Sequence, residues 1–201
     1  MFLQVIQGKV ADPDRYSASL DRWVREVGPS ADGWLGTTSG TYGDGSFIAL
    51  VRFDSAEAAR RNSERPEQGQ WWSEFASALD GDASFDDFEQ VLLIGPGGSD
   101  DAGFVQVMRG RVADVERERA IAQQMSQMPS DFRPDIIGGL EGLKEDGTFA
   151  LALYFTSEAE AREGEQKPMP ADMQAIMDEG QANTTEMTFI DLSKPVFHAP
   201  R

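Results

Sequence analysis

The sequence contains no cysteine and a single histidine, His198. Without a thiol, the chain can form no disulfide and offers no thiolate nucleophile or Cys-based zinc or iron–sulfur site. One imidazole also argues against a His-rich metal site or a Ser-His-Asp triad. Because His198 lies beyond the last strand that we expect, we predict that it is a solvated tail residue and not a ligand.

Nucleotide-binding motifs and long apolar runs are also missing. The segment Gly95-Pro96-Gly97-Gly98 joins two expected strands, whereas a phosphate-binding loop would open a helix. No window approaches the roughly 18 apolar residues that a membrane span needs. The N-terminal segment turns polar after six residues, unlike a signal peptide. We therefore expect no cofactor, no metal and no membrane partner, and a cytoplasmic location.

Basic residues are few. The chain has 18 Lys and Arg against 35 Asp and Glu, which gives a formal net charge of −17. A field of this sign repels the phosphate backbone of nucleic acids, so we expect no nucleic-acid partner. The rest of the composition, with 40% hydrophobic residues, is that of an ordinary folded protein with a solvated acidic surface.

What the sequence does contain is a repeat. Shifting it by 102 positions aligns residues 2–12 with residues 104–114, and seven of these eleven residues are identical. Over residues 2–66 the same shift gives 19 identities, where unrelated sequences would give roughly four. Duplication explains this agreement. We predict a first repeat at 1–95, a linker at 96–102 and a second repeat at 103–197.

Each repeat shows the same order of expected elements. In the first repeat we predict a strand at 2–11, a helix capped by Asp12, strands at 33–39 and 46–53 around the Asp44-Gly45 turn, a helix from Ser55 that is interrupted near Pro66 and resumes at 70–79, and a strand at 84–94. In the second repeat, Ser157 and Glu160 have the spacing of a capping box. The order β-α-β-β-α-β is that of a ferredoxin-like unit, so the predicted class is α+β.

The strand at 46–53, SFIALVRF, is apolar on both faces apart from Arg52. A sheet with both helices on one side would leave the other apolar face bare, and the second repeat is the obvious cover. We therefore predict two tandem ferredoxin-like repeats packed sheet to sheet as an intramolecular dimeric α/β barrel. A further homodimer of such chains is left open.

This duplicated element order resembles the dimeric α/β barrel superfamily, and within it the tandem antibiotic biosynthesis monooxygenase-like proteins. The resemblance implies a ligand cavity between a sheet and its two helices. It also implies, as one activity among several in the superfamily, cofactor-free oxidation of a small aromatic substrate. Fold transfers between such proteins more safely than function.

The two repeats differ in their aromatic residues. All four Trp residues lie in the first repeat, and seven of eight Met residues lie in the second. At the 102-residue shift, Trp23 aligns with Met125, Trp71 with Met173 and Trp72 with Gln174. We predict an aromatic-lined pocket in the first repeat, although Trp at helical spacing also fits simple core packing. The candidate ligand-binding residues are Trp23, Tyr42, Arg52, Asn62, Trp71 and Trp72.

Polar residues within the apolar strands give a further hypothesis. Arg52 would clamp an anion or phenolate beside the Trp pair, with Tyr42 or Asn62 adding a hydrogen bond. Gln4 and the equivalent Gln106 would pair with other groups inside the fold, because a buried amide needs a partner. No residue stands out as a catalytic base.

Two main kinds of function fit these residues. The first is an enzyme that resembles the cofactor-free monooxygenases and acts on a small aromatic substrate. The second is a non-catalytic module that binds a small ligand or a protein partner, or a scaffold without activity. Isomerase or lyase chemistry is a third alternative, and the sequence leaves all three open.

Overall fold

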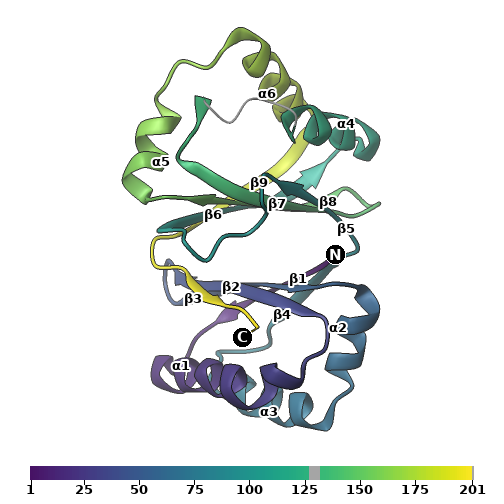
Figure 1. Ribbon diagram of the computed structural model, residues 1–201, viewed down its shortest axis with the longest axis vertical. Coiled ribbons are helices and arrows are strands. Elements are labelled where there is room, and N and C mark those ends of the chain that lie inside the picture. Colours follow the sequence, from purple (N-terminus) through teal and green to yellow (C-terminus); the bar gives the residue numbers. More distant parts are fainter. Residues whose placement is uncertain (127–131, 201) are drawn as a thin grey trace. The chain divides into compact units, whose positions relative to one another are not determined.

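The computed structural model describes residues 1–126 and 132–200, which form two compact units (Figure 1). The first unit contains residues 1–89 and the chain from residue 196 onward, and the second contains residues 90–195. Each unit has one five-stranded antiparallel sheet with helices on one face. Among the described residues, no helix combines the length and apolar character that crossing a membrane requires.

The sheet of the first unit has the strand order β10-β2-β3-β1-β4. Its strands are β1 (Phe2–Lys9), β2 (Trp34–Tyr42), β3 (Ser46–Phe53), β4 (Ser84–Phe88) and β10 (Val196–His198). The hairpin between β2 and β3 turns at the predicted Asp44-Gly45 dipeptide, where Gly45 has a φ of 94°. Glycine adopts this left-handed conformation at little cost, so the local sequence accounts for the turn.

Three helices cover one face of this sheet (Figure 1). They are α1 (Pro13–Arg22), which continues as a π-helical turn over Trp23–Val27, α2 (Ala56–Ser63) and α3 (Pro66–Ala76). The side chain of Asp12 caps α1, and that of Ser55 caps α2. We expected the helix to resume at 70, but α3 begins at Pro66, since proline at the first helical position needs no N–H partner.

The second unit repeats this plan with the strand order β5-β7-β8-β6-β9. Its elements are β5 (Gln90–Ile94), β6 (Phe104–Val112), α4 (Val115–Ser126), β7 (Ile136–Leu143), β8 (Thr148–Phe155), α5 (Glu158–Glu165), α6 (Ala171–Asn183) and β9 (Thr184–Leu192). Ser157 is the N-cap of α5, as predicted, because its hydroxyl accepts a hydrogen bond from the backbone N–H of Glu160. The Glu160 carboxylate in turn accepts a hydrogen bond from the Ser157 hydroxyl. The class is therefore α+β, with two tandem ferredoxin-like units.

The two units exchange strands. The stretch predicted as one strand at 84–94 is two strands separated by Glu89, with β4 bonded to β1 and β5 bonded to β7 of the other sheet. In the other direction, β10 follows the second unit in sequence but pairs with β2 of the first sheet. The compact units therefore differ from the predicted repeats, 1–95 and 103–197, by these two strands.

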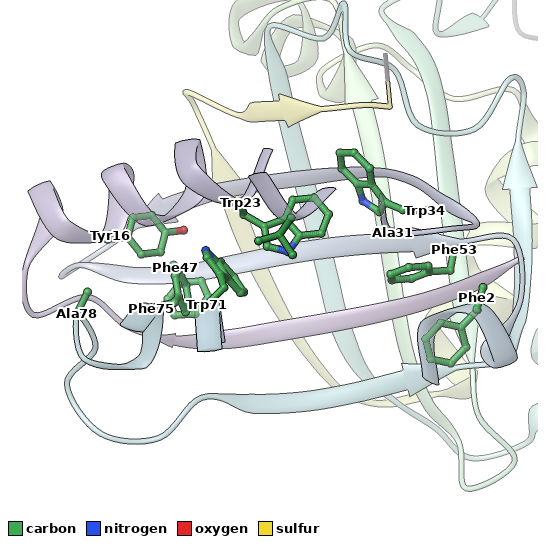
Figure 2. Packing of buried hydrophobic residues seen from close by; sticks show 12 residues of the cluster. Phe2, Tyr16, Trp23, Ala31, Trp34, Phe47, Phe53, Trp71, Phe75 and Ala78 are labelled. Carbon is green, nitrogen blue, oxygen red and sulfur yellow. The ribbon is translucent and has the colours of Figure 1, made fainter. Parts of the chain in front are cut away.

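The core of the first unit lies between its sheet and its helices. Along β3, side chains alternate, and Phe47, Ala49, Val51 and Phe53 face the helices. They pack with aromatic residues from α1, α3 and the π-helical turn, which Figure 2 shows as one cluster. The aromatic residues of the cluster are Phe2, Tyr16, Trp23, Trp34, Phe47, Phe53, Trp71 and Phe75.

Candidate functional site

A cavity of about 730 Å³ lies within the first unit, between the sheet and the helices. A volume of this size suits a small organic molecule. Its aromatic walls are formed by Phe2, Tyr16, Trp23, Phe47, Phe53, Trp71, Trp72, Phe75 and Phe85. Of the six residues predicted to bind a ligand, the structure brings Trp23, Asn62, Trp71 and Trp72 together here.

The rings on the α3 side form a continuous aromatic surface. Trp71 stacks on Phe75 with ring centroids 5.0 Å apart, and Trp72 contacts Phe85 at the same centroid separation. Trp71 is buried, whereas Trp72 is only partly buried and Phe85 is 49% exposed. The adjacent tryptophans therefore hold different positions: one belongs to the core and the other to its exposed margin.

Hydrogen bonds fix two of the indoles. Trp23 donates from Nε1 to Oε1 of Gln68 at 2.7 Å, and Trp71 donates from Nε1 to the Ser19 carbonyl at 2.8 Å. Both N–H groups are therefore used within the protein. What these two residues present to a ligand is their ring faces, which favour flat, polarisable molecules.

Polar residues of the cavity wall are paired across neighbouring elements. Gln4 on β1 donates from Nε2 to Oδ1 of Asp87, which is 2.8 Å away and also lines the cavity. Asn62 accepts a hydrogen bond from Nη1 of Arg65 at 2.9 Å. The equivalent Gln106 in the second unit donates to Asp191 in the same way. The partners of both glutamines are thus carboxylates on the adjacent strand.

The prediction that His198 is a solvated tail residue is wrong. His198 lies in β10, opposite Thr37 of β2, and both residues line the cavity. This strand could not be predicted, because three residues are too few to show a recognisable periodicity. The chain's one imidazole is therefore placed where it can accept or donate a proton at the cavity.

Arg52 and Tyr42 lie on the opposite face of the sheet and do not line this cavity. Arg52 alternates with Val51 and Phe53 along β3, so its guanidinium points away from the helices and lies over Gly36. The Tyr42 hydroxyl accepts a hydrogen bond from Nε2 of Gln7 at 3.2 Å on that face. A clamp formed by Arg52 beside the Trp pair is therefore excluded for this cavity.

Tyr16 lines the cavity although it was not among the predicted ligand-binding residues. Its ring centroid lies 5.4 Å from that of Phe47 and 5.4 Å from that of Phe75. Burial raises the pKa of the Tyr16 hydroxyl to about 12, so it is protonated at any physiological pH. Tyr16 therefore offers a neutral hydroxyl in the aromatic part of the cavity wall.

The second unit has a different interior. The connection from α5 to α6 is three residues longer than that from α2 to α3, so the 102-residue shift does not hold beyond it. The structural counterparts of Trp71 and Trp72 are Ile176 and Met177, and not Met173 and Gln174 as the sequence alignment suggested. At these two positions the indoles of the first unit are thus replaced by non-aromatic side chains.

Two carboxyl groups occupy the interior of the second unit. Glu141 on β7 faces the helices and is 7% exposed, and Glu118 on α4 accepts a hydrogen bond from Nδ2 of Asn183 at 2.9 Å. Burial, aided by the charge of Glu118, raises the pKa of Glu141 to about 8. Burial also raises the pKa of Glu118, against the opposing effect of its Asn183 hydrogen bond. The counterpart of Glu118 in the first unit is Tyr16, and that of Glu141 is Ser39.

No group of three or more His, Cys, Asp or Glu side chains is arranged to hold a metal ion within residues 1–126 and 132–200. No protein family model matches the chain, and no curated protein matches its sequence. Solved structures do match it, over almost its whole length.

Three of these structures are similar to the chain at low sequence identity. A "putative monooxygenase" from Fusobacterium nucleatum subsp. nucleatum ATCC 25586 superimposes with a TM-score of 0.74 and 10% identity, covering 100% of this chain and 95% of that one. A protein of the same description from Lactobacillus acidophilus NCFM gives 0.70 and 11%, with 98% and 96% covered. An anthrone oxidase-like protein gives 0.61 and 14%, with 94% and 90% covered.

These similarities extend over both units and confirm the predicted α+β class with two tandem ferredoxin-like repeats. The chain therefore shares the fold of these three solved structures, two of which are described as putative monooxygenases. At identities of 10–14%, they establish the fold and leave the activity to be argued from the cavity.

Proposed function

We propose that the first unit binds a small, planar aromatic molecule in its cavity. The observation that carries this proposal is the wall of aromatic rings around about 730 Å³ of space, with two indole N–H groups already bonded to the protein. Such a wall gains most from a flat apolar ligand that stacks on the ring faces.

The test is a titration of intrinsic tryptophan fluorescence with phenols and quinones. All four Trp residues lie in the first unit, and three of them line the cavity, so a ligand bound there should quench the emission saturably. Absence of saturable quenching with every phenol and quinone would contradict the proposal.

A matched pair of variants locates the binding. Phe85 lies opposite Ile6 on β1 and lines the cavity, whereas Phe189 lies opposite Met108 at the equivalent place in the second unit. Phe85→Leu should weaken binding about fivefold to tenfold, because one aromatic contact is lost. Phe189→Leu should leave the affinity unchanged. Equal effects of the two variants would argue against a site in the first unit.

Oxidation of the bound molecule by dioxygen is a second candidate function, and the position of His198 favours it. The three similar structures include two described as monooxygenases and one as anthrone oxidase-like. A phenol would lose its proton to the imidazole, and the electron-rich anion would react with O₂ directly. One oxygen atom would form a new carbonyl in place of two hydrogens, which leave with the other oxygen atom as water. The substrate supplies all four electrons, so no external reductant is needed.

Oxygen consumption in the presence of an electron-rich phenol or hydroquinone tests this second function. We expect His198→Gln to lower the rate at least about a hundredfold, as removal of a general base does, while fluorescence quenching by the phenol persists. Uptake of oxygen no faster than in buffer would leave binding as the function. An unchanged rate in the variant would remove His198 from the reaction.

A further inference from the structure

The hydroxyl of Tyr16 is a polar group set deep in the aromatic wall. Tyr16 is 6% exposed, and its ring is held between Phe47 of β3 and Phe75 of α3. In Figure 2 the oxygen lies on the side of the Tyr16 ring that faces Trp23 and Trp71. The ring is therefore fixed by packing, and its hydroxyl has a defined position.

Among residues 1–126 and 132–200, no group forms a hydrogen bond with this hydroxyl. The indole N–H groups of Trp23 and Trp71, in the same wall, are both paired within the protein. The Tyr16 oxygen is not among the fully enclosed unpaired side-chain atoms, so it opens onto the cavity, where a ligand atom that accepts its hydrogen bond would take the place of solvent. Because the hydroxyl stays protonated at physiological pH, it is available as a donor.

We propose that Tyr16 is a specificity-determining residue that donates a hydrogen bond to a carbonyl oxygen of the planar ligand. The inference rests on the proposed function, because it concerns the same cavity. The counterpart of Tyr16 in the second unit is Glu118, whose carboxyl already accepts a hydrogen bond from Asn183. The donor is thus a feature of the first unit and not of the repeated fold.

The test compares two probes of the same shape. 1,4-Naphthoquinone carries carbonyl oxygens and naphthalene carries none, and both are titrated by tryptophan fluorescence against the full chain and Tyr16→Phe. We expect the variant to bind naphthoquinone about tenfold more weakly, the loss typical of one hydrogen bond, with naphthalene affinity unchanged. Tyr42→Phe is the control, because its hydroxyl lies on the other face of the sheet, and it should change neither affinity.

Each outcome decides the proposal. If Tyr16→Phe binds both probes like the unaltered chain, Tyr16 is not the donor, although the cavity still binds aromatic molecules. If it loses affinity for both probes equally, the ring supports the wall and the hydroxyl has no specific role. If the unaltered chain binds neither probe, the proposed function and this inference both fail.

Discussion

Glu141→Gln should make the protein more stable at pH 8.5, by on the order of 3 to 5 kcal/mol, and should have little effect near pH 4.5. Burial raises the pKa of Glu141 from 4.5 to about 8. Between these two pH values the folded chain keeps a proton that the unfolded chain has lost, so stability falls as pH rises and stays low above pH 8. Gln is uncharged and similar in shape, so the variant lacks this loss.

Urea unfolding at pH 4.5, 7 and 8.5 measures the difference. Glu118 strengthens the effect, because a second buried carboxyl raises the pKa of Glu141 by repulsion. The control is Glu145→Gln, since Glu145 is exposed and its pKa is lowered by a hydrogen bond from Arg119. That variant should gain no stability at pH 8.5. If the free energy of unfolding changed with pH in the same way for the unaltered chain and for Glu141→Gln, ionisation of Glu141 would not destabilise the folded chain.

The second large effect is expected from Gly110→Ala, which should cost about 3 kcal/mol or more. Gly110 lies on β6, and a Cβ there would overlap the backbone carbonyl of Glu186 on β9. Backbone of a paired strand cannot move aside without breaking the ladder. The measurement is the change in the urea midpoint, read with an unchanged slope as a change in stability.

Gly8→Ala is the matched control, since Gly8 is the counterpart of Gly110 in the first unit. The nearest atom to a Cβ at Gly8 is Cε1 of the Phe47 ring, 2.8 Å away, and a ring can shift where backbone cannot. The difference arises because the pairing of β9 with β6 continues past Gly110, whereas the pairing of β4 with β1 stops at Gln7 and does not reach Gly8. Equal losses for the two variants would contradict this account.

Much of the fold was predictable because its signals are local. Asp12 and Ser55 cap helices, and Asp44-Gly45 forms the turn of a hairpin. The sequence repeat predicted the second unit. The division of 84–94 into two strands was not predictable, because both β4 and β5 are extended and only pairing partners far away in sequence distinguish them. Local periodicity does not identify the sheet to which a strand belongs.

The candidate site shows the same limit. Trp23, Trp71 and Trp72 could be recognised from composition, and they line the cavity. Arg52 was misplaced because a strand that is apolar on both faces gives no clue to which side its polar residue faces. The roles of His198 and Glu141 were missed for different reasons. His198 lies in a very short strand near the end of the chain, and Glu141 is a single Glu within an apolar strand.

The strand exchange has a consequence for the synthesis of the chain. A ribosome releases residues 1–89 long before it releases β10, yet the sheet of the first unit includes β10 as an edge strand. During translation, the outer edge of β2 therefore has no partner strand until the whole second unit has been synthesised. His198 joins the cavity wall only when that strand pairs with β2, so the wall is completed after the second unit has emerged.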